Sequence, residues 1–176
     1  MKQALFWVVR VLLLAGLVTV SAVGQSTQEK NKALMKQAYE YFNADNWDKL
    51  AELIAPNVKD HNPMPGQKPG FGGIRETFKV FRNGFPDLTM TPNEIFAEGD
   101  WACVRVTMSG TQKGDWMGTK ATGKKFTIQG FDLVRIVNGK AVERYGTFDN
   151  VTMMIQLGMM PPPGQAGGGK MDEKKK

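Results

Sequence analysis

The sequence contains one cysteine and one histidine in 176 residues, Cys103 and His61. A single cysteine cannot form an internal disulfide. A single histidine excludes the metal sites that are built from several imidazoles, and no ligand spacing around Asp60 and His61 supports another kind of metal site. The G-x-S-x-G motif of serine hydrolases is also missing. We therefore predict neither a metal site nor a Ser-His-Asp triad.

The N-terminus lacks a hydrophobic run long enough to cross a membrane. Its apolar run, residues 11–23, has 13 residues, whereas a spanning helix needs roughly 20. Lys2 and Arg10 precede this run, and Ala22 and Gly24 are small residues at the positions that a signal peptidase requires. This pattern predicts a signal peptide over residues 1–24.

Export follows from that prediction. We expect the mature chain to begin near Gln25, to be periplasmic or secreted, and to keep no stable membrane span after cleavage. The alternative is an uncleaved anchor that begins near Leu5 and is interrupted by Arg10.

The body of the chain carries little net positive charge. The whole sequence carries +6, but Lys2 and Arg10 belong to the signal, and the residues from Pro161 onward contribute another +2. Residues 25–160 therefore keep only +2, which excludes the concentrated basic surface of a nucleic-acid-binding domain. The Pro-, Gly- and Lys-rich residues 159–176 predict a disordered tail.

What the body does contain is a helical part followed by a strand-rich part. Apolar residues recur at helical spacing over 26–56, with a break at residues 43–46, and again over 70–85. Asp45 or Asn46 is expected to cap the second helix, and Pro56 to end it. Residues 89–111 predict a hairpin that turns at Gly99-Asp100, and residues 126–149 predict one that turns at Asn138-Gly139. This order indicates an α+β domain with N-terminal helices on one face of a curved antiparallel sheet.

Asp132 stands at the centre of an otherwise apolar strand segment, "IQGFDLVRI". A two-residue turn at Asn138-Gly139 pairs Val137 with Lys140, and counting outward from that pair places Asp132 opposite Tyr145. Two interpretations of Asp132 remain open. It is an acid/base group in a pocket, or it is a structural carboxylate that hydroxyl or backbone donors hold.

Several other residues have both a functional and a structural interpretation. His61 is either a donor at the mouth of a pocket or an ordinary surface or packing residue. Trp116 and Met117 either cover a ligand or pack on the sheet. Gly118 and Gly123-Lys124 imitate a phosphate-binding loop, but Lys125 replaces the required Ser or Thr and a strand follows instead of a helix. We therefore reject a nucleotide site.

The segments "KALMKQAYEYFNADNWDKLAELIAPNVKDHNP", "FPDLTMTPNEIFAEGDWACVRVTMSGTQKG", "FDLVRIVNGKAVERY" and "FDNVTMMIQLG" occur in unbroken order. Together they resemble the SnoaL-like polyketide cyclases, also called ester cyclases, of the nuclear-transport-factor-2-like superfamily. The resemblance covers roughly residues 29–158 and defines a domain over 25–158. It implies a cone-shaped sheet that encloses a pocket with the N-terminal helices, and a homodimer formed through the sheet.

The resemblance also implies an activity and a set of site residues. Family members close a ring by intramolecular aldol condensation without metal or cofactor, with an aspartate as acid/base that Asp132 matches. His61 matches a pocket position, and Gln112 stands where the family motif G-T-H-x-G has histidine. Asp132, His61 and Gln112 are thus the expected catalytic residues. The expected substrate-binding residues are Tyr145, Trp116, Met117 and Phe42.

These observations predict an exported, cofactor-free enzyme that uses an aspartate on a small hydrophobic carbonyl compound. A protein that binds a small hydrophobic ligand without changing it is the alternative, and Gln112 together with export favours it. A pure assembly module is a third reading.

Overall fold

The computed structural model describes residues 27–164, which fold into helices packed on a five-stranded sheet. The predicted signal peptide over 1–24 and most of the predicted tail lie outside the described residues. Between residues 27 and 164, no helix is both long and apolar enough to span a membrane.

The helices agree closely with the apolar spacing. The first helix is described over residues 27–43, followed by α2 (Trp47–Leu53) and α3 (Gly70–Gly84). The Asn46 side chain accepts a hydrogen bond from the Lys49 backbone N–H at 3.1 Å, so the predicted cap of α2 is confirmed. The predicted end at Pro56 is wrong, because the chain is already extended from Ile54, in strand β1 (Ile54–Asp60).

The sheet has the order β1-β5-β4-β3-β2. Strands β2 (Thr89–Glu98), β3 (Trp101–Thr111), β4 (Lys125–Val137) and β5 (Lys140–Phe148) form the antiparallel meander that the two hairpins predict. Strand β1 joins the edge of β5 in parallel, so the sheet is mixed and not purely antiparallel. A last helix, α4 (Asn150–Leu157), follows β5 and is capped by Asp149.

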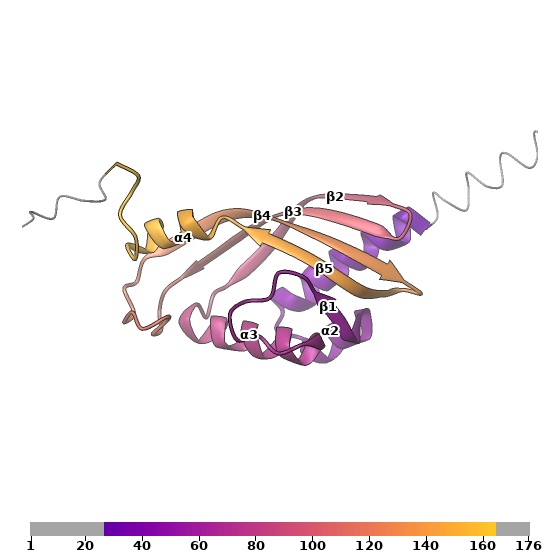
Figure 1. The fold of residues 1–176 in the computed structure, drawn as a ribbon, viewed down its shortest axis with the longest axis horizontal. Helices are drawn as coiled ribbons and strands as arrows, with labels where there is room; N and C mark the ends of the chain where they lie inside the picture. Colours follow the sequence, from indigo (N-terminus) through magenta and orange to yellow (C-terminus); the bar gives the residue numbers. More distant parts are fainter. Residues whose placement is uncertain (1–26, 165–176) are drawn as a thin grey trace, which may run out of the picture.

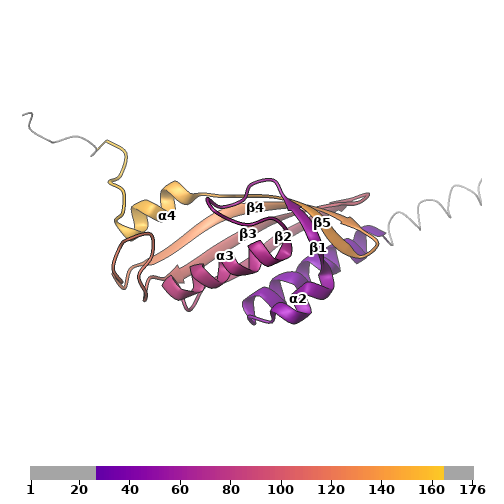
Figure 2. The same cartoon turned by 60° about the horizontal axis from the view of Figure 1, so that its bottom comes forward.

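The three N-terminal helices cover one face of the sheet, which we call the inner face (Figures 1 and 2). Strand β4, and β3 up to Gly110, alternate between buried and less buried residues, as expected when only one face is covered. Val104, Val106, Ile128 and Val134 point to the inner face and belong to a single hydrophobic core with the helices. The opposite, outer face of the sheet has no covering element among residues 27–164.

The hairpin between β4 and β5 contains a bulge that the sequence did not reveal. Val137 pairs with Lys140 as predicted, and Ile136 pairs with Ala141 in the same register. The register then shifts by one residue, because Arg135 pairs with Glu143. One extra residue on β5 reverses the facing of every residue beyond it.

The bulge changes the partners of Asp132. Gly146 lies opposite Asp132, whereas Tyr145 pairs with Leu133, so the predicted pairing of Asp132 with Tyr145 is wrong. Counting outward from the turn without a bulge would also pair Gly130 with Thr147, whereas Gly130 pairs with Phe148.

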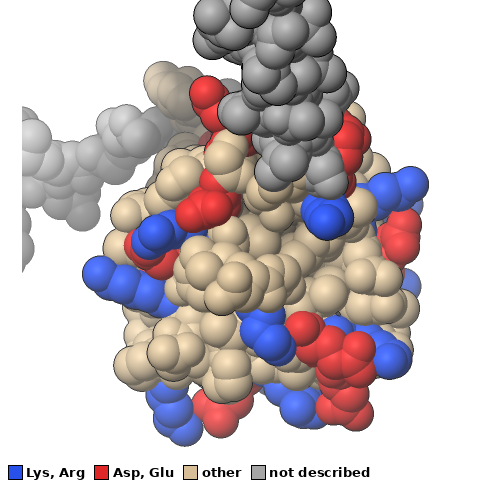
Figure 3. All heavy atoms as spheres, turned by 90° about the vertical axis from the view of Figure 1, so that its right-hand side faces the viewer, with Lys and Arg blue, Asp and Glu red and all other residues tan. Residues whose placement is uncertain are grey.

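Basic and acidic side chains are interspersed over the end of the molecule drawn in Figure 3. Elsewhere in the described chain, neighbouring residues also form ion pairs, such as Lys32 with Glu29 and Lys49 with Glu52, whichever face they lie on. Charge of one sign does not gather on this face.

Candidate functional site

Asp132 lies in the middle of β4 and points from the inner face toward the helices. Only 5% of its surface is exposed. The Tyr39 hydroxyl of the first helix donates a hydrogen bond to Oδ2 at 2.6 Å, and the Arg144 Nη2 of β5 lies 2.6 Å from Oδ1. Both carboxylate oxygens therefore have a polar neighbour inside an otherwise apolar interior.

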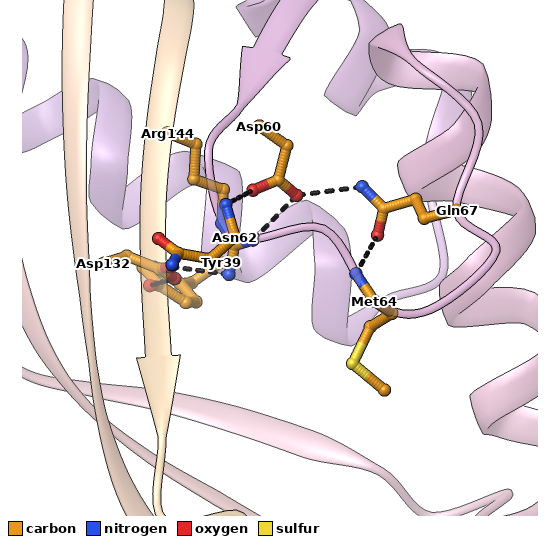
Figure 4. Close-up of polar contacts among 7 residues, drawn as sticks. All are labelled: Tyr39, Asp60, Asn62, Met64, Gln67, Asp132 and Arg144. Carbon is orange, nitrogen blue, oxygen red and sulfur yellow. Dashed lines mark hydrogen bonds and ion pairs between the residues drawn. The ribbon is translucent and has the colours of Figure 1, made fainter.

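Arg144 connects this carboxylate to a second one on the adjacent edge strand. Its Nη1 donates to Asp60 Oδ2 at 3.2 Å (Figure 4). Asp60 also accepts hydrogen bonds from Gln67 Nε2 at 2.9 Å and from the Asn62 backbone N–H at 3.1 Å. The four side chains of Tyr39, Asp132, Arg144 and Asp60 form a continuous row, which we call the acid–arginine row.

The charges of the row favour particular protonation states. Burial, together with the neighbouring Asp132 carboxylate, raises the pKa of Tyr39 well above its ordinary value, so its phenol stays protonated and acts as a donor. Burial lowers the pKa of Arg144, but Asp132 and Asp60 outweigh that effect and raise it overall. The guanidinium is therefore permanently charged.

Two cavities meet at this row. The inner cavity, about 100 Å³, lies between the first helix, α2, α3 and the sheet, and among residues 27–164 Asp132 is the only acid that lines it. The second cavity has about 330 Å³ and lies beneath the loop that follows β1 and beside α3. We call it the outer cavity, although it is not on the outer face of the sheet. Its walls are more polar than those of the inner cavity. Phe78 and Arg144 line both cavities and thus stand at their junction.

Gly146, directly across from Asp132, also lines the outer cavity. A Cβ atom at this position would lie 2.2 Å from Arg144 Nη2 and 2.7 Å from Asp132 Oδ1. The absence of a side chain at residue 146 is therefore what gives the guanidinium and the carboxylate room to meet.

His61 and Tyr145 lie outside these cavities, because the bulge turns Tyr145 to the outer face. Their rings stack with centroids 3.9 Å apart, and His61 Nε2 lies 3.0 Å from Glu143 Oε2. The expectation that Tyr145 lies on one pocket wall with Asp132 is therefore wrong, and His61, expected at the mouth of a pocket or as a surface or packing residue, lines neither cavity. They form a separate contact on the opposite face of the sheet.

Gln112 is fully buried and holds a loop. Its amide nitrogen donates to the backbone oxygens of Thr119 and Lys120 at 3.3 and 3.2 Å, and its amide oxygen accepts from the Thr122 hydroxyl at 2.8 Å. All three hydrogen bonds lie within residues 112–122. Gln112 lines neither cavity. The structure does not bring it together with Asp132.

The expected substrate-binding residues are divided in the same way. Phe42 lines the inner cavity, where its ring packs edge-on against Trp47 and Phe78. Trp116 packs edge-on against Phe81 and Phe85 in the core, and Met117 is exposed on a turn. Of the sequence-predicted site residues, only Asp132 and Phe42 meet in a cavity.

Three polar residues of the site were missed by sequence reasoning. Tyr39 follows the helical spacing and looks like a core residue, Arg144 was placed on the wrong face by the undetected bulge, and Asp60 was considered only as a metal ligand. A signal for Arg144 existed, because a buried acid usually has a cationic partner. In residues 27–164, no group of three His, Cys, Asp or Glu residues is arranged to hold a metal ion.

Comparisons with known proteins agree with this architecture. A family model described as SnoaL-like polyketide cyclase matches residues 32–157. The aklanonic acid methyl ester cyclase DnrD of Streptomyces peucetius is 25% identical over 130 residues, which are 71% of this chain and 88% of DnrD.

Solved structures give the same result. IdmH from Streptomyces antibioticus is 32% identical with a TM-score of 0.66, over 72% of this chain and 96% of IdmH. TsrD from Streptomyces laurentii is 26% identical with a TM-score of 0.68, over 75% of this chain and 97% of TsrD. The predicted α+β fold is confirmed, and the chain belongs to the SnoaL-like polyketide cyclase family.

Proposed function

We propose that this protein is an enzyme that uses Asp132 as an acid/base on a small hydrophobic carbonyl compound. The observation that carries the proposal is a single carboxylate that lines an apolar cavity, with a phenol on one oxygen and a guanidinium beside the other. A base in such a site reacts only with a substrate that enters the cavity, and the fixed neighbours hold it in one orientation. Membership of a cyclase family supports the same chemistry.

The proposed reaction begins with proton transfer. Asp132 takes a proton from the carbon next to a carbonyl, the C–H electron pair forms a C=C bond, and the carbonyl π pair moves to oxygen to give an enolate. The enolate carbon then attacks a second carbonyl of the same molecule. A C–C bond forms, and the resulting alkoxide takes the proton back from Asp132. All atoms and electrons balance within the substrate and one carboxyl group, so no cofactor is needed.

Tyr39 has a positioning role in this scheme. Its hydroxyl donates to Oδ2 at 2.6 Å, and because its pKa is raised well above its ordinary value it keeps its proton at neutral pH. Oδ2 is thereby occupied, so the proton of the substrate goes to Oδ1. The phenol fixes which oxygen acts as the base.

We expect Asp132→Asn to slow proton transfer by about 10²- to 10⁴-fold, the usual contribution of a general base. The amide keeps the shape of the carboxylate but cannot accept the proton. Deuterium incorporation at the α-carbon of 2-tetralone in D₂O, followed by NMR, measures the step without knowledge of the natural substrate. Asp115→Asn is the control, since Asp115 pairs with Lys120 on the exposed loop. Equal exchange rates for wild type and Asp132→Asn would sink the proposal.

A ligand-binding protein without chemistry is the second candidate. The observation in its favour is the ion pair itself, because a carboxylate that is neutralised by Arg144 is a stable structural element as well as a base. The exchange experiment separates the two functions. A binding protein would bind 2-tetralone and leave its exchange at the rate in buffer.

Export is also part of the proposal. The N-terminal pattern supports cleavage before Gln25 and a periplasmic or secreted mature protein. N-terminal sequencing of the protein from its native host tests it, and an intact Met1 on membrane-bound material would contradict it.

We further propose that the protein is a homodimer that pairs through the outer face. Phe96, Leu133 and Tyr145 are exposed and lie in one cross-strand row with Cys103, and Phe131 is adjacent. Contiguous exposed apolar side chains of this kind usually mark an interface.

Phe131→Glu is therefore expected to convert the dimer to a monomer, because it places a charge directly beside the apolar row. Light scattering at micromolar concentration measures the change. Val80→Glu, at an exposed position on α3 on the other side of the molecule, should remain dimeric. A dimer that survives Phe131→Glu unchanged would place the interface elsewhere.

A further inference from the structure

Arg144 has no role in the acid/base chemistry proposed above, although it lies next to Asp132. It lines both cavities, its Nη2 lies 2.6 Å from the catalytic oxygen of Asp132, and its Nη1 is held by Asp60 at 3.2 Å. Figure 4 shows the guanidinium between the two carboxylates, with the loop that carries Met64 and Gln67 alongside.

The sizes of the cavities decide where a ring-containing substrate lies. An engineered cavity of about 150 Å³ binds benzene, and the inner cavity, at about 100 Å³, is smaller than that. The outer cavity, at about 330 Å³, falls within the range of roughly 300–1,000 Å³ that is typical of ligand pockets. Of the two, the outer cavity therefore has the room for a ring system, and a reactive carbon at its junction with the inner cavity would meet Arg144 and Asp132.

Gly146 lies where the two cavities adjoin. A Cβ atom there would lie 2.2 Å from Arg144 Nη2 and 2.7 Å from Asp132 Oδ1, so the ion pair fills the space that a side chain would take. Asp132 lines the inner cavity, whereas Arg144 and Gly146 beside it line the outer one. Oδ1 is buried and makes no hydrogen bond of good geometry, although the guanidinium is close to it. A substrate atom that reached the ion pair would thus meet a carboxylate oxygen with an unused lone pair and a guanidinium with N–H donors.

We propose that Arg144 is a second catalytic residue, which binds the enolate oxygen of a cyclic or aryl ketone whose rings lie in the outer cavity; this inference rests on the proposed function of Asp132. The α-proton moves to Asp132 Oδ1, the C–H electron pair becomes the C=C bond, and the carbonyl π pair moves to the oxygen that Arg144 holds. Once Asp132 is protonated, the ion pair loses its anion, and the enolate takes that place beside the guanidinium.

Asp60 keeps Arg144 in position during this exchange of partners. Its carboxylate is fixed by Gln67 and by the Asn62 backbone N–H, so it anchors the guanidinium when Asp132 becomes neutral. The outer walls supply the polar groups Asn62, Gln67, Thr147 and Asn150. These favour a ketone that carries hydroxyl or carbonyl substituents on its rings.

The test uses benzoylacetone, whose enolate and neutral forms differ in ultraviolet absorption. Wild-type protein should raise the ionised fraction of the bound probe, and Arg144→Gln should lower the enolate-to-neutral ratio by roughly 10- to 100-fold, the size of one charge-assisted hydrogen bond. Arg144→Lys should restore part of the ratio, because it keeps the charge. Asp132→Asn should raise the ratio above that of the wild type, because it removes the competing anion.

Arg144→Gln leaves two buried carboxylates, Asp132 and Asp60, without their cation, and the variant could fail to fold for that reason. The double variant Asp60→Asn/Arg144→Gln, which leaves only one such carboxylate, is therefore tested as well. Circular dichroism selects whichever of the two is folded. An enolate-to-neutral ratio like that of the wild type in either folded variant would overturn the role of Arg144. Absence of benzoylacetone binding to the wild type at millimolar concentration would overturn the substrate class.

The two proposals fail in different ways. If Arg144→Gln leaves the enolate ratio unchanged while Asp132→Asn stops deuterium exchange, the acid/base function stands and the role of Arg144 falls. If deuterium exchange in the presence of Asp132→Asn is as fast as with the wild type, the acid/base function is wrong, whatever the enolate ratio shows.

Discussion

Replacing Arg144 with leucine is expected to lower the free energy of unfolding by about 3–5 kcal/mol, the usual cost of removing one partner from a buried ion pair. Asp132 and Asp60 would both lose their cation, and both are largely shielded from water. The side chain of Arg144 is 19% exposed, so solvent screens its charge only weakly. Urea denaturation monitored by circular dichroism measures the loss.

Arg135→Leu is the matched control. Arg135 also pairs with an acid, Glu143, at 3.0 Å, but it lies on the outer face and its side chain is 42% exposed. Exposed ion pairs of this kind contribute about 0–1 kcal/mol, so this variant should unfold close to the wild type. Adding Asp132→Asn to Arg144→Leu should recover part of the lost stability, since one uncompensated charge is removed. Equal effects of Arg144→Leu and Arg135→Leu would show that the acid–arginine row is open to water.

Gly73→Ala is expected to cost about 3 kcal/mol or more, or to prevent folding. A Cβ atom at this buried position in the first turn of α3 would lie 1.7 Å from the backbone oxygen of Lys68. A backbone atom cannot rotate away as a side chain can, so the loop before the helix or the helix itself would have to move. The cost therefore exceeds the roughly 1–3 kcal/mol of ordinary overpacking.

The neighbouring glycine provides the control. A Cβ atom at Gly72 would meet nothing within 4 Å, and the residue is exposed on the same helix. Gly72→Ala should raise the free energy of unfolding by about 0.5–1 kcal/mol, because alanine favours the helix over glycine. Thermal melting of both variants gives the comparison, and a destabilised Gly72→Ala would contradict it.

The helices and the meander could be predicted from sequence because their signals are local. Apolar spacing located α3, and Asn138-Gly139 located the turn between β4 and β5. The parallel partner of β5 could not be found in this way. Strand β1 is separated from β5 by about half of the domain, and no local pattern fixes which edge it joins.

The site was predicted in part for a similar reason. Asp132 was recognised because an acid within an apolar strand is unusual on its own, without reference to any partner. Its neighbours depend on the register of β4 against β5, and the bulge at Arg135 and Ile136 changed that register by one residue. A single unpaired residue on β5 thus decides that Arg144, and not Glu143, lies on the same face of the sheet as Asp132. Had Glu143 faced inward, the cavity would hold two acids and no cation.

Asp60 and His61 are consecutive residues whose side chains go to opposite sides of the sheet. Asp60 holds Arg144 on the inner side, while His61 stacks on Tyr145 and contacts Glu143 on the outer side. The backbone N–H of His61 also donates to the carbonyl oxygen of Arg144 at 2.8 Å. One peptide bond therefore joins the residue that anchors the arginine on the inner side to the residue that makes the aromatic contact on the outer side, so the end of this edge strand takes part in both faces of the sheet.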